Sequence, residues 1–263
     1  MTTASTDPLS GPPPPLADAA ALFLDFDGTL APIAARPQDV QVPHWVHPTL
    51  RALGERLDGA LAIVSGRPIA QLDDFLAPLR LITAGAHGAE WRDAHGTVHQ
   101  LAAAPPGSVV RHAQELVARH AGLLFEPKPS GLSLHYRARP ELEAECRDTL
   151  VAALAAVPGA STEWEWLQGQ FVYELKQRAV SKGSAVQALL RQPPFAGRQP
   201  VFVGDDRTDE DGIAASQAAG GYGVRVGGGE TRARYRLADP AAVGAWLRTA
   251  LESTTEPQEN RAA

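Results

Sequence analysis

The sequence has very little cysteine, no long apolar run and no excess of basic side chains. Cys146 is the only cysteine among 263 residues, so no intrachain disulfide can form and nothing indicates an oxidising compartment. Its acidic neighbours Glu143, Glu145 and Asp148 disfavour a thiolate if they lie close in space, and we interpret Cys146 as structural. No apolar stretch approaches the ~20 residues that span a bilayer.

The charge balance of the chain is mildly acidic. Against 30 acidic side chains there are 24 basic ones, and the formal charge of -6 attracts neither nucleic acid nor an anionic membrane. The start of the chain also lacks the basic residues and apolar run of a signal peptide. We therefore expect a cytoplasmic monomer that acts on a small polar molecule and binds no nucleic acid or membrane.

Both ends of the chain are polar or rich in proline. Residues 1–18 include four consecutive prolines, Pro12 to Pro15, and residues 252–263 contain few apolar side chains. Such segments bury too little apolar surface to fold, so we predict that both are disordered. The chain as a whole is 44% hydrophobic and 21% charged, which is typical of a globular protein.

Three short apolar runs each end in polar residues. They span Ala20 to Phe26, Ala60 to Val64 and Pro200 to Val203, and each is typical of a buried parallel strand. Helical patterns follow at Pro68 to Leu76 and at Asp209 to Ala218, where acidic residues occupy the first turn. Strands that alternate with helices predict an α/β fold with a doubly wound, mostly parallel, Rossmann-like sheet.

The middle of the chain has a different pattern. Between Gly131 and Arg137, apolar and polar residues alternate as in a half-exposed strand. A helix followed by two strands occurs twice, which predicts a small inserted α+β domain, or cap, at residues 105–177. The core domain then comprises residues 19–104 and 178–251. The cap helices are expected at Val109 to Arg119 and Pro140 to Val157, and its strands at Leu123 to Glu126, Gly131 to Arg137, Thr162 to Leu167 and Gln170 to Lys176.

Asp25 and Asp27 lie at the end of the first apolar run and are followed by Gly28. Two carboxylates so placed can cooperate only if the chain turns sharply after them, which a glycine permits. Asp25 is a candidate nucleophile for attack on phosphorus. Asp27 is a candidate acid for the leaving alcohol and a candidate base for the attacking water. The alternative is that Asp27 and Gly28 simply form a turn after a strand.

A dense acidic cluster follows the third apolar run. Residues 205–211 contain five acids, and such a cluster is costly unless it is solvated or holds a cation. Carboxylate oxygens suit Mg²⁺, which also shields phosphate oxygens. The alternative is an acidic helix start, but the preceding strand places the cluster at the same sheet edge as Asp25.

Ser65, Gly66 and Lys182 are candidate phosphate ligands. Ser65 and Gly66 follow the second apolar run, where a hydroxyl and turn amides can hold a phosphate oxygen. Lys182 precedes a helix pattern from Ser184 to Arg191, and its ammonium can neutralise charge at the phosphoryl group and at Asp25. Both have ordinary alternatives, since Ser65 also suits a helix N-cap and a lone lysine is usually solvated.

The order of these motifs along the chain resembles that of the haloacid dehalogenase superfamily. The resemblance implies an aspartyl-phosphate route with Asp25 as nucleophile, Asp27 as general acid and base, and Lys182 as a further catalytic residue. It also implies that Ser65, Gly66 and Lys182 bind the phosphate. It implies Mg²⁺ as cofactor, with the metal site formed by Asp25, the Asp27 carbonyl and Asp205, and with Asp206 and Asp209 nearby.

A finer resemblance is carried by the motifs Ala84 to Glu90, Glu126 to Lys128, Leu134 to Arg137, Glu174 to Lys176 and Gly204 to Asp211. Together they resemble the trehalose-6-phosphate phosphatase family, and the resemblance covers nearly all of Ala21 to Trp246. In that family the inserted domain is a lid over the active site, and its acids and a lysine contact the sugar hydroxyls. By position those residues match Glu126, Lys128 and Glu174.

This finer resemblance implies hydrolysis of trehalose 6-phosphate to trehalose and phosphate. One alternative is a phosphatase of the same fold acting on another sugar phosphate, because the core motifs carry no information about the sugar. Another is a catalytically silent sugar-phosphate sensor. Gln177 and Ala179 depart from the family, which often has a proline and a glycine there. Two plainer interpretations also stay open, with His87 as a core or turn histidine and with His135 and Arg137 on the wet face of a strand.

Overall fold

The computed structural model describes residues 11–34, 36–100, 103–128 and 131–252. The chain divides into two compact units. The first holds the residues up to His99 and those from Ser181 onwards, and the second holds Gln100–Val180. The predicted cap, residues 105–177, lies inside the second unit. No helix within the described ranges has the length and apolar character needed to cross a membrane.

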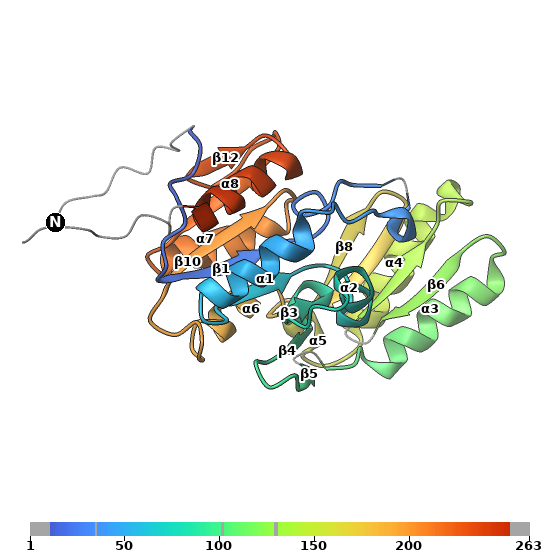
Figure 1. Cartoon of the computed structure of the whole chain (residues 1–263). Helices are drawn as coiled ribbons and strands as arrows, with labels where there is room; N and C mark the ends of the chain where they lie inside the picture. Colours follow the sequence, from blue (N-terminus) through green and yellow to red (C-terminus); the bar gives the residue numbers. More distant parts are fainter. Residues whose placement is uncertain (1–10, 35, 101–102, 129–130, 253–263) are drawn as a thin grey trace, which may run out of the picture. The chain divides into compact units, whose positions relative to one another are not determined.

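A large sheet forms the centre of the first unit (Figure 1). Of the eight strands found among the described residues, the six from β12 to β3 are parallel, and β4 pairs antiparallel with β3. The predicted α/β fold with a mostly parallel sheet is therefore confirmed. In sheet order the strands are β12 (Tyr235–Leu237), β11 (Tyr222–Val226), β10 (Gln199–Gly204), β1 (Ala20–Leu24), β2 (Leu61–Val64), β3 (Ile82–Gly85), β4 (Glu90–Arg92) and β5 (Val98–Gln100).

Strand β1 lies between β10 and β2. Leu24 is in register with Val203 of β10 and with Ile63 of β2. Every residue of β1 is buried, as expected for a parallel strand that is covered on both faces. The three strands run in one direction, so the residues that follow them emerge at the same edge of the sheet. This edge brings together the motifs that the sequence spreads along the chain.

Helices cover the large sheet on both sides. Figure 1 shows α1 and α8 on one face and α6 and α7 on the other. Helix α6 begins earlier than the predicted Ser184, because Ser181 caps it and Ser184 returns a hydrogen bond to Ser181. The helices of this unit are α1 (Val46–Arg56), α2 (Ile69–Leu76), α6 (Lys182–Leu189), α7 (Asp209–Ala218) and α8 (Pro240–Glu252), with short 3₁₀ turns at Pro37–Asp39 and Ala86–Gly88.

The second unit is an antiparallel sheet with helices. Its strand order is β6-β7-β9-β8, and its own apolar core includes Leu132, Leu134, Leu175 and the buried Cys146. Burial raises the pKa of the Cys146 thiol to about 11, in keeping with a structural role. The elements are α3 (Gly107–Arg119), β6 (Leu124–Lys128), β7 (Gly131–His135), a 3₁₀ turn (Pro140–Leu142), α4 (Glu143–Ala155), α5 (Ala160–Glu163), β8 (Trp164–Gly169) and β9 (Val172–Gln177).

The alternation expected between Gly131 and Arg137 is only partly present. The apolar members are buried, as predicted, but Ser133 on the polar face is also only 1% exposed. Ser133 lies on the central strand β7, where Glu126 and Glu174 are its register partners on either side. The long side chains of its two neighbours explain why a short polar residue there is covered.

The terminal segments are described only in part. Residues 1–10 and 253–263 lie outside the described ranges, and α8 ends at Glu252, the first residue of the predicted tail. From Gly11 onwards the predicted N-terminal segment contacts the core. Leu16 is 2% exposed, and the indole Nε1 of Trp246 donates a hydrogen bond to the Pro14 carbonyl at 2.9 Å.

Candidate active site

A buried lysine joins two carboxylates at the carboxyl edge of the large sheet. The Nζ atom of Lys182 donates to Oδ1 of Asp25 at 2.7 Å and to Oδ1 of Asp209 at 2.6 Å. Asp25 follows β1, and its backbone N–H donates to the Val203 carbonyl of β10. Asp25 and Lys182 are each 3% exposed and Asp209 is fully buried. Three motifs far apart in the sequence thus meet at one point.

Burial controls the electrostatics of this group. It raises the pKa of Asp25 well above the ordinary value, although the Lys182 ammonium opposes the shift. Burial raises the pKa of Asp209 in the same way. For Lys182 burial alone would lower the pKa, but the carboxylates of Asp25 and Asp209 outweigh it and the net shift is upward. Lys182 is therefore a permanent positive charge beside Asp25.

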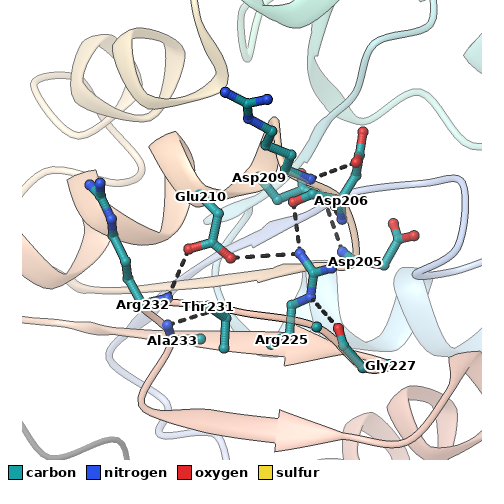
Figure 2. Close-up of polar contacts among 12 residues, drawn as sticks. Asp205, Asp206, Asp209, Glu210, Arg225, Gly227, Thr231, Arg232 and Ala233 are labelled. Carbon is teal, nitrogen blue, oxygen red and sulfur yellow. Dashed lines mark hydrogen bonds and ion pairs between the residues drawn. The ribbon is translucent and has the colours of Figure 1, made fainter. Parts of the chain in front are cut away.

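The acidic loop between β10 and α7 is shaped by one of its own side chains. The Oδ2 atom of Asp209 accepts hydrogen bonds from the backbone N–H groups of Asp205 at 3.0 Å and Asp206 at 2.9 Å (Figure 2). Gly204 permits this turn, since a Cβ atom there would lie 2.3 Å from Cγ of Asp209. Asp205 is thereby held close to Asp25, whereas Asp206 is exposed.

Three carboxylates are arranged to hold a cation. Among the described residues, oxygens of Asp25, Asp205 and Asp209 lie within 4.8 Å of one another. With Lys182 the group carries two net formal negative charges when all three acids are ionised, which a divalent cation can neutralise. The Oδ1 atom of Asp205 is buried and has no hydrogen-bond partner within the described ranges. All these ligands are hard oxygens, so the residues present fit Mg²⁺.

The other two acids assigned to the metal lie outside this group of side-chain oxygens. Asp206 uses its Oδ1 atom to accept the backbone N–H of Arg207 at 2.5 Å. The carboxylate of Asp27 pairs with Arg67. The assignment of the Asp27 carbonyl as a ligand stays a prediction, as does a role for Asp206.

Two independent features of the structure favour glycine over any other residue at position 28. Its φ of +77° lies in the left-handed region, which side chains with a Cβ rarely adopt. A Cβ atom at this position would also lie 2.1 Å from Oδ2 of Asp205. The turn after Asp27 therefore does more than end a strand, because it makes room for the carboxylate of the acidic loop.

Ser65 and Gly66 lie at the end of β2, next to a strained turn after β3. Ser65 is 1% exposed, and its Oγ accepts the Arg67 N–H at 3.2 Å. A Cβ atom at Gly66 would lie 2.6 Å from the ring of His87. Ala86 and His87 have φ values of 49° and 57°, and their N–H groups donate to the carbonyls of Arg67 and Ser65. His87 is thus a turn histidine that packs on the candidate phosphate loop.

The three candidate residues of the cap share the polar face of its sheet. Glu126 and Glu174 flank Ser133 in register on adjacent strands, and Lys128 lies two residues from Glu126 on β6. Lys128 Nζ donates to Glu174 Oε1 at 2.6 Å, and Glu126 Oε2 lies 2.8 Å from Nε2 of His135. The sequence pattern places His135 on the wet face of the strand but does not predict its contact with Glu126.

Arg67 and Arg225 lie beside the site but were not assigned a role from the sequence. Arg67 forms a two-bond ion pair with Asp27, and Arg225 donates to the Asp206 carbonyl at 2.9 Å. Arg67 directly follows the candidate phosphate loop, which is a local signal. Arg225 stands near the end of an apolar run, where a charged residue is a weak signal, and only its packing identifies it.

Comparison with known proteins identifies the family. The family model for trehalose-phosphatase matches residues 23–241. The trehalose-6-phosphate phosphatase of Escherichia coli (strain K12) is 39% identical over 259 residues, which cover 97% of this chain and 95% of that protein. A structure of Aspergillus fumigatus trehalose-6-phosphate phosphatase has a TM-score of 0.69 at 27% identity, covering 93% of this chain and 100% of that one.

A more distant structure shows the fold alone. A phosphatase of the haloalkanoate (HAD) enzyme superfamily from Bacteroides thetaiotaomicron has a TM-score of 0.61 at 16% identity, covering 88% of this chain and 93% of that one. The resemblance inferred from the sequence motifs is therefore confirmed by sequence identity along nearly the whole chain. The chain belongs to the trehalose-phosphatase family, whose members are phosphoric monoester hydrolases.

Proposed function

We propose that this protein hydrolyses trehalose 6-phosphate to trehalose and inorganic phosphate, through a phosphoryl group carried on Asp25 and with Mg²⁺ as cofactor. The observation that carries the proposal is the buried contact of Lys182 with both Asp25 and Asp209, beside the carboxylate of Asp205. A buried ammonium among three buried or half-buried acids is costly for stability, and such groups cluster at functional sites.

The first step is attack by a carboxylate oxygen of Asp25 on phosphorus. An acyl-phosphate bond forms, and the bond between phosphorus and the sugar oxygen breaks. Asp27 supplies the proton that the leaving alkoxide requires, because an alkoxide is too basic to leave unprotonated. Lys182, Ser65 and the turn amide of Gly66 stabilise the negative charge on the phosphoryl oxygens during this transfer.

The second step regenerates Asp25. Asp27, now ionised, takes a proton from a water molecule, and the resulting hydroxide oxygen attacks phosphorus. The bond between phosphorus and the Asp25 oxygen breaks, inorganic phosphate leaves and the carboxylate is restored. When bound, the divalent cation supplies positive charge that shields the nucleophile and the phosphoryl oxygens from each other.

The polar face of the cap sheet is proposed to recognise the sugar. Sugar hydroxyls both donate and accept hydrogen bonds, so they match carboxylates and an ammonium placed close together. Glu126, Lys128 and Glu174 provide this combination, and Lys128 and Glu174 are each about one-third exposed. Partly exposed ion pairs contribute little to stability, roughly 0 to 1 kcal/mol each, so exchanging them for hydroxyl contacts is not costly.

Phosphate release from a panel of sugar phosphates tests the proposal. We expect trehalose 6-phosphate to give the highest kcat/KM, EDTA to abolish the activity and Mg²⁺ to restore it, with Ca²⁺ a poor substitute because it favours more ligands at longer distances. A higher kcat/KM for another sugar phosphate would replace the substrate. Binding of a sugar phosphate without any turnover would favour the catalytically silent sensor.

A further inference from the structure

Arg225 is a nearly buried arginine beside the acidic loop. It lies on β11 in register with Gly204, the residue that immediately precedes Asp205. Its side chain is 12% exposed, which is low for a residue that is usually found on the surface. Neither of the two chemical steps proposed above uses this side chain. An almost buried guanidinium needs partners, and its partners indicate what it does.

The contacts of Arg225 join the acidic loop and the start of α7 to the loop after β11. Its Nη1 atom donates to the Asp206 carbonyl at 2.9 Å and lies 3.6 Å from Oε1 of Glu210. Its Nε atom donates to the Gly228 carbonyl at 3.3 Å. Figure 2 shows the side chain between the acidic loop on one side and the loop after β11 on the other.

Glu210 completes this connection. It directly follows Asp209 in the first turn of α7, and its Oε2 atom accepts the backbone N–H of Arg232 at 2.9 Å. Its side chain is 18% exposed. The Arg225–Glu210 pair therefore links three segments, which are the acidic loop, the start of α7 and the loop after β11. Arg225 bonds to the backbone of the acidic loop, and Glu210 bonds to the backbone of the loop after β11.

The acidic loop needs such support because its carboxylates repel one another. Asp205 and Asp209 approach Asp25 closely enough to share one ion, and among the described residues the Lys182 ammonium donates hydrogen bonds only to Asp25 and Asp209. Without a metal, repulsion favours opening of the loop at Asp205. A guanidinium that holds the Asp206 carbonyl opposes that opening and adds positive charge near Asp205.

We propose that Arg225 is a positioning residue that keeps the acidic loop in the geometry required for divalent-cation binding, acting through the Asp206 carbonyl and Glu210. The inference rests on the metal requirement of the proposed function. Arg225 itself touches neither the metal nor the substrate in this scheme. Its removal should therefore weaken metal binding and leave turnover at saturating metal largely intact.

The chain provides a matched control in Arg236. This residue is in register with Arg225 on the neighbouring strand β12. Its guanidinium donates to the carbonyls of Gly227 and Gly229, in the same loop after β11. Within the described residues its side-chain hydrogen bonds go to that loop and not to the acidic loop. Arg236→Met thus removes a comparable side chain and loop contact without affecting the support of Asp206.

The experiment is a Mg²⁺ titration by calorimetry of the full-length protein without substrate, repeated as the Mg²⁺-dependent change in Tm. We expect Arg225→Met to weaken Mg²⁺ binding about tenfold, because it removes a charge-assisted hydrogen bond and an ion pair. Arg236→Met should stay within about twofold of wild type. Arg225→Lys should recover part of the loss, since an ammonium can replace the ion pair with Glu210 but cannot make both backbone hydrogen bonds of the guanidinium. At saturating Mg²⁺, kcat of Arg225→Met should stay within about threefold of wild type.

Each other result has a distinct meaning. Equal Mg²⁺ affinity for wild type and Arg225→Met overturns the inference and leaves the proposed function intact. Equal losses in Arg225→Met and Arg236→Met also overturn it, because they indicate general stability. If wild type itself binds no Mg²⁺, the metal requirement of the proposed function fails, and this inference with it. If Arg225→Met does not fold, Arg225→Gln replaces it, and unchanged Mg²⁺ affinity in that variant overturns the inference.

Discussion

Asp27 and Arg67 form a two-bond ion pair in which Nε donates to Oδ2 at 2.5 Å and Nη2 donates to Oδ1 at 2.7 Å. The guanidinium also lies over the ring of Phe75, with 4.9 Å between the Arg67 Cζ atom and the ring centroid. This pair fixes the direction of the Asp27 carboxylate, two residues after the proposed nucleophile. Both carboxylate oxygens accept from Arg67 in this pair, so Asp27 acts as the acid only after one of the two bonds opens and that oxygen takes a proton. The other bond then keeps the carboxyl group aligned for the first chemical step.

Replacing Arg67 should lower kcat/KM more for a substrate whose leaving group needs a proton than for one whose leaving group does not. In Arg67→Met, we expect kcat/KM for trehalose 6-phosphate to fall about 10- to 100-fold, because Asp27 loses its alignment as acid. The value for p-nitrophenyl phosphate should stay within about threefold, since p-nitrophenolate leaves without a proton. The quantity kcat/KM is compared because it reports the step in which the leaving group departs. Equal losses on the two substrates would contradict a role in aligning the acid.

The parts of the site that follow strand ends could be predicted from the sequence. Asp25 and Lys182 are 157 residues apart, yet an apolar run before Asp25 and a helix pattern after Lys182 indicate where each belongs. Parallel strands deliver their carboxyl ends to one edge, which is a general rule of this fold class. The approach of Asp25 to Asp209 follows from that rule, whereas Lys182 opens helix α6 and its role was inferred from the order of the motifs.

The supporting arginines could not be predicted in the same way. Strand β11 contains a glycine and ends in a short run around Arg225, and the sequence pattern predicts no strand there. A single charged residue in such a run usually points to solvent, so periodicity carries no signal for its burial. The two hydrogen bonds from Arg67 to Asp27 likewise depend on the distance between the loop after β2 and the loop after β1. Local patterns determine the elements, whereas side chains that join different loops depend on tertiary packing.

Asp25→Asn should abolish turnover without loss of the fold. The amide is nearly the same size and its oxygen can still accept from Lys182, but it is a very poor nucleophile. We expect kcat to fall by about three orders of magnitude or more, since the change removes the step and does not merely slow it. Tm in EDTA should not decrease, because the substitution removes a buried carboxylate whose pKa is raised by burial. A variant with a tenth of wild-type kcat would require another nucleophile.

Gly28→Ala should disturb the metal site through Asp205. The added Cβ atom would lie 2.1 Å from Oδ2 of Asp205, so that carboxylate has to move. We expect the Mg²⁺ concentration for half-maximal activity to rise about tenfold or more, along with a strain cost of ~1 to 2 kcal/mol in stability. Titration of activity with Mg²⁺ and the free energy of unfolding measure the two effects.

Gly96→Ala is the control for that substitution. Gly96 has a φ of +83°, close to the φ of Gly28, but nothing lies within 4 Å of an added Cβ atom. Its alanine variant should lose similar stability through backbone strain and keep the wild-type Mg²⁺ requirement. If both variants changed the Mg²⁺ requirement equally, strain alone would explain the effect and the contact with Asp205 would not matter.

The metal-free protein should become less stable as the pH rises from about 4 to about 6. Burial, helped by the charge of Asp209, raises the pKa of Asp205 to about 6, whereas an unfolded aspartate titrates near roughly 3.9. In this window the folded protein holds a proton that the unfolded chain releases, so stability falls as the pH rises. In EDTA, Tm of wild type should fall across this range more steeply than Tm of Asp205→Asn. Equal slopes in the two proteins would rule out Asp205 as the source.

Substitutions on the polar face of the cap sheet should slow the hydrolysis of the sugar phosphate but not that of a phosphate ester without a sugar. Glu126→Ala and Glu174→Ala each remove a carboxylate from the polar face of the cap sheet. If that carboxylate binds a sugar hydroxyl, its loss costs ~1 to 3 kcal/mol, which is roughly a 5- to 150-fold fall in kcat/KM for trehalose 6-phosphate. For p-nitrophenyl phosphate, which has no sugar hydroxyls, each variant should equal wild type. Both substrates are assayed with each purified variant.

Glu145→Ala separates recognition from damage to the cap. Glu145 Oε1 lies 3.0 Å from Nε2 of His120, much as Glu126 lies beside His135, but it is on helix α4 and not on the sheet. Loss of this exposed pair should leave both activities unchanged. If Glu145→Ala reduced trehalose 6-phosphate hydrolysis as strongly as Glu126→Ala, any weakening of the cap would be sufficient to explain the loss. A fall confined to the sheet variants and to the sugar substrate can arise only if the polar face contributes to binding of the sugar in the transition state.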